Sequence, residues 1–210
     1  MGFGLSNILH LIGQILLKPC MCVLLLLMIV TVWQFGDFAV EFFTERRKRK
    51  KLDATGLLKK IHEENDLQKT IEGSGLPARQ KAALNVLLES SDMPKTSLTA
   101  LAQRLLATEE EKYDKAVGIT DLVAKLGPMF GLLGTLIPLG PGIIALGHGD
   151  TETLSKSLAI AFDTTISGVI SAAICCVISN IRKKWYEDYL ITFELVMESM
   201  LEEVDANAKK

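Results

Sequence analysis

Three long stretches of the chain are almost free of charged side chains. Residues 19–36 and 126–149 contain no Asp, Glu, Lys or Arg, and residues 157–181 contain one, Asp163. As α-helices these stretches would be about 27, 36 and 38 Å long, whereas the hydrocarbon core of a bilayer is roughly 30 Å thick. The pattern therefore predicts three membrane-spanning helices, at about residues 19–39, 124–146 and 156–181.

The segment before the first span has a different, amphipathic pattern. Apolar residues recur at helical spacing in residues 3–18, while Ser6, His10, Gln14 and Lys18 recur every four residues on the other side. Pro19 then suits the first turn of a new helix, where its missing N–H is harmless. We therefore predict that residues 1–18 form a separate amphipathic helix lying flat in the outer membrane interface.

The segments between and after the spans also show helical patterns. Residues 40–121 read as helices with breaks at Gly73-Ser74-Gly75 and at Ser90-Ser91-Asp92-Met93-Pro94. In residues 182–210 an apolar heptad seam predicts that the third helix continues and packs against helices of its own chain or of a neighbour. The seam consists of Tyr186, Leu190, Phe193, Met197, Met200 and Val204.

Charge placement predicts the orientation of these spans. Charged residues make up 23% of the chain, which is ordinary for a soluble protein, yet the mean hydropathy is +0.28. Both hold because the charges are clustered: residues 44–121 carry fifteen Lys and Arg and residues 182–210 carry five, against Lys18 and Lys156 on the other side. By the positive-inside rule, the N-terminus lies outside and the C-terminus in the cytoplasm.

The expected fold is an all-α membrane protein with three transmembrane helices and long cytoplasmic helical extensions. It divides into the amphipathic helix 1–18, the first span 19–39, a cytoplasmic region 40–121, a core 122–181 with the other two spans, and a tail 182–210. No nucleophile–base set, phosphate-binding glycine loop or metal quartet appears, so we expect neither an enzyme nor a cofactor or metal site. The basic run at residues 46–51 follows a span without interleaved aromatics, which favours topology and lipid contact over nucleic-acid binding.

Small residues mark packing faces on the second and third spans. Helices in lipid associate through close contact of small side chains rather than through a hydrophobic drive. The two faces therefore predict a helix bundle or a pore. They contain Gly127, Gly131, Gly134 and Thr135 in the second span, and Ala161, Thr165, Gly168 and Ala172 in the third.

Two prolines are expected to break the second helix. Pro138 and Pro141 each remove a backbone hydrogen bond, and the carbonyl groups left free must face protein or water in a membrane. The break indicates either a water-accessible path or a local kink beside a tightly packed neighbour.

Asp163 is the ionisable residue deep in a predicted span. A charge there is energetically expensive and indicates function by default. The alternatives are that it carries a proton, that it pairs with a cation such as Lys156, or that it stays neutral and hydrogen-bonded. Its helical direction is about 200° from that of Thr165, so we expect it to organise other helices rather than share the Thr165 face.

The core resembles the MotA/TolQ/ExbB proton channel family. The resemblance rests on Leu126-Gly-Pro-Met-Phe-Gly-Leu-Leu-Gly-Thr135, a Gly149-Asp150 loop, and Leu158-Ala-Ile-Ala-Phe-Asp-Thr-Thr-Ile-Ser-Gly168. Three spans with a cytoplasmic insert after the first are more similar to ExbB and TolQ than to four-span MotA. Pro138 stands where many relatives have glycine, which indicates a divergent subfamily.

The resemblance implies a homopentamer in the prokaryotic plasma (inner) membrane. The second and third spans would line a pore around a single-span partner like ExbD, TolR or MotB, in two copies. That partner would supply the titrating acid, with Thr135 and Thr165 of this chain facing the pore. The complex would couple H⁺ or Na⁺ flow to partner movement that transmits force across the envelope. A non-motor scaffold or signalling anchor, and a stand-alone ion channel, are the competing hypotheses.

Overall fold

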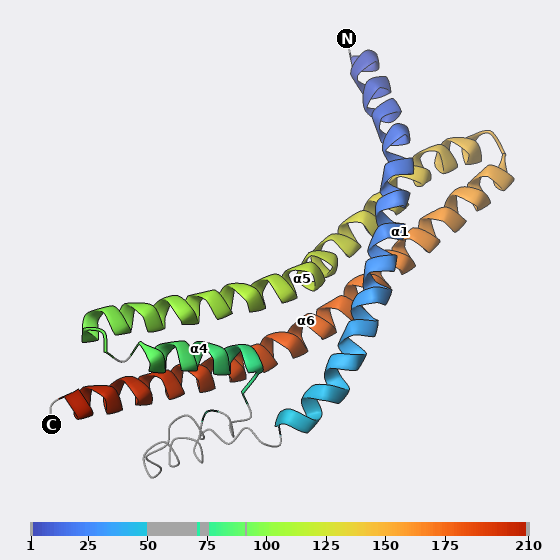
Figure 1. The fold of residues 1–210 in the computed structure, drawn as a ribbon. Helices are drawn as coiled ribbons and strands as arrows, with labels where there is room; N and C mark the ends of the chain where they lie inside the picture. The colour runs from blue at the N-terminus through green and yellow to red at the C-terminus, as the bar shows by residue number, and fades with distance from the viewer. Residues whose placement is uncertain (1, 50–70, 72–75, 91, 209–210) are drawn as a thin grey trace. The chain divides into compact units, whose positions relative to one another are not determined.

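The described part of the chain is helical (Figure 1). The computed structural model describes residues 2–49, 71, 76–90 and 92–208, and these contain no strand. The helices are α1 (Gly2–Arg49), α4 (Ala78–Glu89), α5 (Lys95–Gly147) and α6 (Thr151–Ala208). The all-helical class predicted from the sequence is confirmed.

Three of these helices are long and apolar enough to cross a membrane. These candidates lie in Leu11–Phe43, Lys95–Gly147 and Thr151–Glu202, which confirms the prediction of three long apolar helices. Much of their apolar surface is exposed, including Ile29 at 67%, Leu136 at 60% and Phe162 at 63%. Helices that are apolar on their outward faces as well as their packed faces are typical of membrane spans.

The chain divides into two compact units. One contains Met1–Phe38 and Gly118–Asn180, and the other contains Ala39–Val117 and Ile181–Lys210. The first unit holds most of each apolar segment and the second holds most of the charged residues. We refer to them as the span unit and the polar unit.

Helix α1 corrects the expected boundary at Pro19. Residues 3–18 are not a separate helix, because α1 runs from Gly2 to Arg49 with Pro19 inside it. Proline removes one backbone hydrogen bond from a helix, whereas ending one helix and starting another would leave about four carbonyls and four N–H groups without helical partners. In a nonpolar environment the continuous helix is therefore the smaller loss.

Helix α5 corrects the expected break at Pro138 and Pro141 for the same reason. It is helical without interruption from Lys95 to Gly147, with Pro128 also inside it. Pro138 is buried in the span unit. Membrane helices tolerate proline where neighbouring helices cover the freed backbone groups, so α5 can continue through these prolines without ending.

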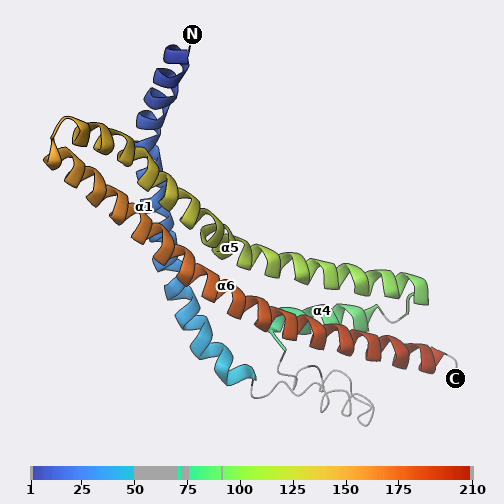
Figure 2. The same cartoon turned by 180° about the vertical axis from the view of Figure 1, so that it is seen from behind.

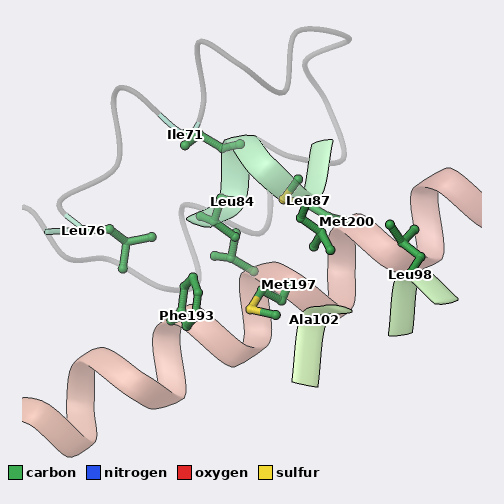
Figure 3. Packing of buried hydrophobic residues seen from close by; sticks show 10 residues of the cluster. Ile71, Leu76, Leu84, Leu87, Leu98, Ala102, Phe193, Met197 and Met200 are labelled. Carbon is green, nitrogen blue, oxygen red and sulfur yellow. The ribbon is translucent and has the colours of Figure 1, made fainter. Parts of the chain in front are cut away.

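The polar unit has an apolar core built from α4, the start of α5 and the end of α6 (Figure 3). Helix α4 buries Gln80, Leu84 and Leu87 at helical spacing. Phe193 and Leu84 are fully buried. The other buried members are Ile71, Leu76, Leu98, Ala102, Val196, Met197 and Met200.

The helix bounds and the core residues can be compared with the predicted breaks and the predicted heptad seam. The break near residue 90 is confirmed, because α4 ends at Glu89 and α5 begins at Lys95, whereas Gly73-Ser74-Gly75 lies outside the described residues. Phe193, Met197 and Met200 of the seam are in the core, and the side chain of Val204 is not described. The helices that cover the seam belong to the same chain.

A buried ion pair joins the end of α1 to α6 in the polar unit. The Arg182 Nε donates to the Glu41 carboxylate at 2.7 Å, and these side chains are 8% and 25% exposed. The Tyr186 hydroxyl donates to the other Glu41 oxygen at 2.9 Å, and its ring stacks on Tyr113 with centroids 4.4 Å apart. Burial, and then the negative charge of Glu41, raise the pKa of Tyr186 well above its usual range.

Candidate functional site

In the span unit, α5 and α6 form an antiparallel pair (Figure 2). Gly149, with a φ of 78°, takes a left-handed conformation in the turn between them. Such a φ favours glycine because it has no Cβ. A Cβ on Gly127 would lie 2.6 Å from the Gly168 carbonyl oxygen, and one on Gly142 would lie 3.0 Å from the Ser157 Cβ. The pairing of early α5 with late α6 residues, and of late with early, defines the antiparallel arrangement.

The predicted small-residue faces meet in this pair. Gly127, Gly131 and Gly134 all approach α6 closely enough that an added Cβ would meet it within 4 Å. Their partners include Gly168 and Ala172, and Ala161 is buried in the same helix. Thr164 was not predicted as a contact residue, yet a Cβ added to Gly134 would lie 2.5 Å from the Thr164 Cβ. Thr164 fills the space that Gly134 leaves.

Helix α1 covers one side of the α5–α6 pair. The thiol of Cys20 donates to the Phe130 carbonyl oxygen at 3.4 Å, and Leu27 packs with Val123 and Cys175 in a small apolar cluster. Phe130 precedes Gly131 by one residue, so it is turned by about 100° from the contact face of α5. That turn carries it to the side where α1 lies.

Asp163 lies on the same side as α1. It precedes Thr164 by one residue and lines a groove of about 180 Å³ with Met21, Leu24, Leu25, Met28, Thr164 and Ser167. The alternative pairing with Lys156 is not found, because Lys156 instead binds Glu152 at 2.7 Å. Asp163 is an exposed residue in this chain, and it points away from the side that carries Thr135 and Thr165.

Thr135 and Thr165 lie together on the opposite side of the pair. Each follows a contact residue by one position, Thr135 after Gly134 and Thr165 after Thr164. Because the helices are antiparallel, a turn of about 100° in each carries both side chains to one side. Both residues are partly exposed. We call this the threonine side.

The two threonine hydroxyls are held by their own helices. The Thr135 hydroxyl donates to the Leu132 carbonyl at 2.7 Å, and the Thr165 hydroxyl donates to the Ala161 carbonyl at 3.1 Å. A hydroxyl that donates once still has two acceptor lone pairs. The threonine side therefore offers uncharged acceptors for water or a cation without an ionised group.

A second polar contact between α5 and α6 was not anticipated from the sequence. The Ser179 hydroxyl donates to Oδ1 of Asp121. Ser179 is 2% exposed, and Asp121, three residues before the predicted second span, is partly buried. The contact joins positions 58 residues apart, so no local sequence motif indicates it.

The turn between the two spans is a capping structure. The Thr153 backbone N–H donates to Oδ1 of Asp150 at 3.0 Å, and its hydroxyl donates to Oδ2 at 2.5 Å. These bonds hold the pKa of the Asp150 carboxyl below its usual range. Within the described residues, no group of three His, Cys, Asp or Glu side chains is placed to hold a metal ion.

The sequence of this chain is similar to those of known proteins. Residues 68–195, more than half of the chain, match the MotA/TolQ/ExbB proton channel family. The chain is also 32% identical over 104 residues to a "Motility protein A" of Aquifex aeolicus (strain VF5). That match covers 48% of this chain and 39% of the relative, so it spans well under half of the relative's length. On the family match, this chain belongs to the MotA/TolQ/ExbB proton channel family.

Proposed function

We propose that this chain is the ring-forming subunit of an ion-driven membrane motor. Its family consists of inner-membrane proton channels associated with motor-like complexes, and its members work with single-span MotB-like or ExbD-like partners. The motor would couple the flow of H⁺, or of Na⁺, to movement of such a partner. The partner would transmit the force across the envelope.

The placement of Thr135 and Thr165 is the observation that carries this proposal. Both hydroxyls lie on the side of the α5–α6 pair away from α1, beside the close glycine contacts. Polar groups in a membrane must face protein or water. In a ring of identical chains, the threonine sides would face the centre and α1 would face outward. We propose five copies, with two partner helices inside the ring.

The titrating acid of the cycle is assigned to the partner. Thr135 and Thr165 cannot carry a charge, and Asp163 lies on the α1 side, in a groove with Met21 and Leu25. Asp163 would therefore organise the bundle, because a carboxylate there needs protein cover in the membrane.

The charge distribution supports an outside N-terminus and a cytoplasmic C-terminus. The Lys and Arg residues concentrate in residues 44–121 and in the tail, and such residues remain on the cytoplasmic side. The basic run after α1 would then meet anionic headgroups of the inner leaflet. The amphipathic start of α1 would meet the outer interface.

Valine substitution at the two threonines tests the proposal. Thr165→Val and Thr135→Val keep the side-chain shape and remove the hydroxyl. The chain would be reconstituted in liposomes with a MotB-like or ExbD-like single-span partner, and proton uptake followed with an internal pH dye. We expect both variants to lose partner-dependent uptake. Thr99→Val is the matched control, because the Thr99 hydroxyl also bonds its own helix, to Lys95 at 2.9 Å, but in the polar unit.

Each competing hypothesis gives a different result. A scaffold or signalling anchor would show no proton uptake with the wild-type chain and would keep its function in the valine variants. A stand-alone channel would conduct without the partner. Native mass spectrometry in mild detergent supplies the ring size, and a monomer or dimer there and in lipid would overturn the ring. Exchanging external Na⁺ for K⁺ at constant pH separates Na⁺ from H⁺ as the driving ion.

A further inference from the structure

The Asp121–Ser179 contact lies on the same side of the helix pair as the two threonines. Asp121 precedes Thr135 by 14 residues, and Ser179 follows Thr165 by the same 14. Fourteen residues make just under four helical turns, about 21 Å in length, and return to within about 40° of the starting direction. The threonine side therefore has polar groups at two levels, each built from one α5 residue and one α6 residue.

The level formed by Asp121 differs chemically from the threonine level. Thr135 and Thr165 offer hydroxyls, whereas Asp121 offers a carboxylate, a group that can accept and release a proton. Ser179 is almost completely buried and fixes one oxygen of that carboxylate. In the proposed orientation, Asp121 is at the cytoplasmic end of the spans.

We propose that Asp121 accepts the transported proton at the cytoplasmic end of the passage and that Ser179 positions its carboxylate. The proposal rests on the proposed motor function. An O–H bond forms on Asp121 as an O–H bond of a hydronium ion in the passage breaks. The reverse transfer then gives the proton to cytoplasmic water and restores the carboxylate, with no change of oxidation state.

Charged residues flank this contact in the sequence and on α1. Lys125 is one turn further along α5, on the face that i,i+4 neighbours share. From α1, Asp37 lines a shallow hollow with Ile119. On α6, Lys183 is one turn beyond Ser179 in the sequence.

Proton uptake by the complex in liposomes tests the proposal. We expect Asp121→Asn to lose partner-dependent uptake and Asp121→Glu to keep it, because glutamate can still take and release a proton. Asp114→Asn is the matched control: Asp114 is two turns earlier in α5 and exposed, and this variant should conduct normally. Ser179→Ala should shift the cytoplasmic pH at which uptake is half-maximal while leaving the ring assembled.

The outcomes separate this inference from the proposed function. If the wild-type complex conducts, Thr165→Val abolishes uptake and Asp121→Asn conducts normally, the role of Asp121 is refuted and the motor is not. If the wild-type complex does not conduct, the proposed function fails instead. Should Asp121→Asn fail to assemble, loss of uptake in an assembled Asp121→Glu ring would refute proton acceptance.

A chemical probe gives a readout that is independent of flux. Dicyclohexylcarbodiimide reacts with protonated carboxyl groups in apolar surroundings, so its attachment can be mapped by mass spectrometry of the full-length chain in membranes. We expect labelling of Asp121 that falls as pH rises and that Ser179→Ala displaces along the pH axis. Absence of label at Asp121 at every pH, with other carboxyls labelled, would overturn the proposal. Protection by Na⁺ at constant pH would refute the proton as its ligand.

Discussion

Replacing Gly127 with alanine tests the close contact on which the threonine side depends. The added Cβ would lie 2.6 Å from the Gly168 carbonyl oxygen and 3.0 Å from the Ala172 Cβ. A carbon–oxygen contact between helices is normally about 3.3–3.6 Å, so α5 and α6 must separate locally by about 0.7–1.0 Å. A backbone oxygen cannot rotate out of the way as a flexible side chain can.

Overpacking of this kind destabilises proteins by about 1–3 kcal/mol. Gly118→Ala is the matched control, because Gly118 is in the same helix and an added Cβ there would meet nothing within 4 Å. Replacing a helical glycine by alanine stabilises a helix by about 0.5–1 kcal/mol when there is room. Both variants gain this helix propensity, so they should differ in their free energy of unfolding by the overpacking cost, about 1–3 kcal/mol.

The measurement is unfolding of the purified protein in mixed micelles by increasing sodium dodecyl sulfate, followed by tryptophan fluorescence. The same Gly127→Ala protein would be assayed for proton uptake with its partner, where displaced helices should reduce uptake. Equal unfolding free energies for Gly127→Ala and Gly118→Ala would refute the reasoning. They would mean that α5 and α6 do not meet at Gly127, and the shared direction of the two threonines would then lose its basis.

Three further outcomes are expected. Arg182→Met should destabilise the chain by about 3–5 kcal/mol, because it leaves Glu41 partly buried without its cation, and a double-mutant cycle with Glu41→Gln should recover part of that loss. Phe193→Ala should lose about 3–5 kcal/mol from the polar unit, against about 0.5 kcal/mol or less for the exposed Ile191→Ala, as measured by chemical denaturation. Because the pKa of Asp150 is lowered in the folded chain, its ionised form should stabilise the fold above about pH 4. This contribution should disappear as the pH falls through the lowered pKa. An Asp150→Ala chain should lack that part of the pH dependence of the unfolding free energy.

The spans could be predicted from the sequence because their cause is local. A charge-free stretch such as residues 126–149 is long enough to cross a bilayer whatever it packs against. The predictions of a new helix at Pro19 and of a break at Pro138 are wrong. They rest on the cost of proline in an isolated helix in water. In α1 and α5, ending the helix at the proline would leave more backbone groups unpaired than continuing it does. The cost of those unpaired groups depends on what surrounds the helix, which local sequence does not specify.

The site was harder to predict than the spans because helical spacing gives directions around one helix only. The sequence places Thr164 and Thr165 about 100° apart, but only the position of Gly134 shows that Thr164 is the packed residue and Thr165 the one turned aside. The same holds for Asp163, which becomes an α1-side residue only once Met21 and Leu25 are beside it. Nothing in the sequence around Asp121 or Ser179 marks either residue as a candidate. They become candidates only because they contact each other between α5 and α6. One residue of offset decides which side a group faces: Thr164 and Thr165 carry the same hydroxyl, yet Thr164 packs against Gly134 and only Thr165 lies on the threonine side.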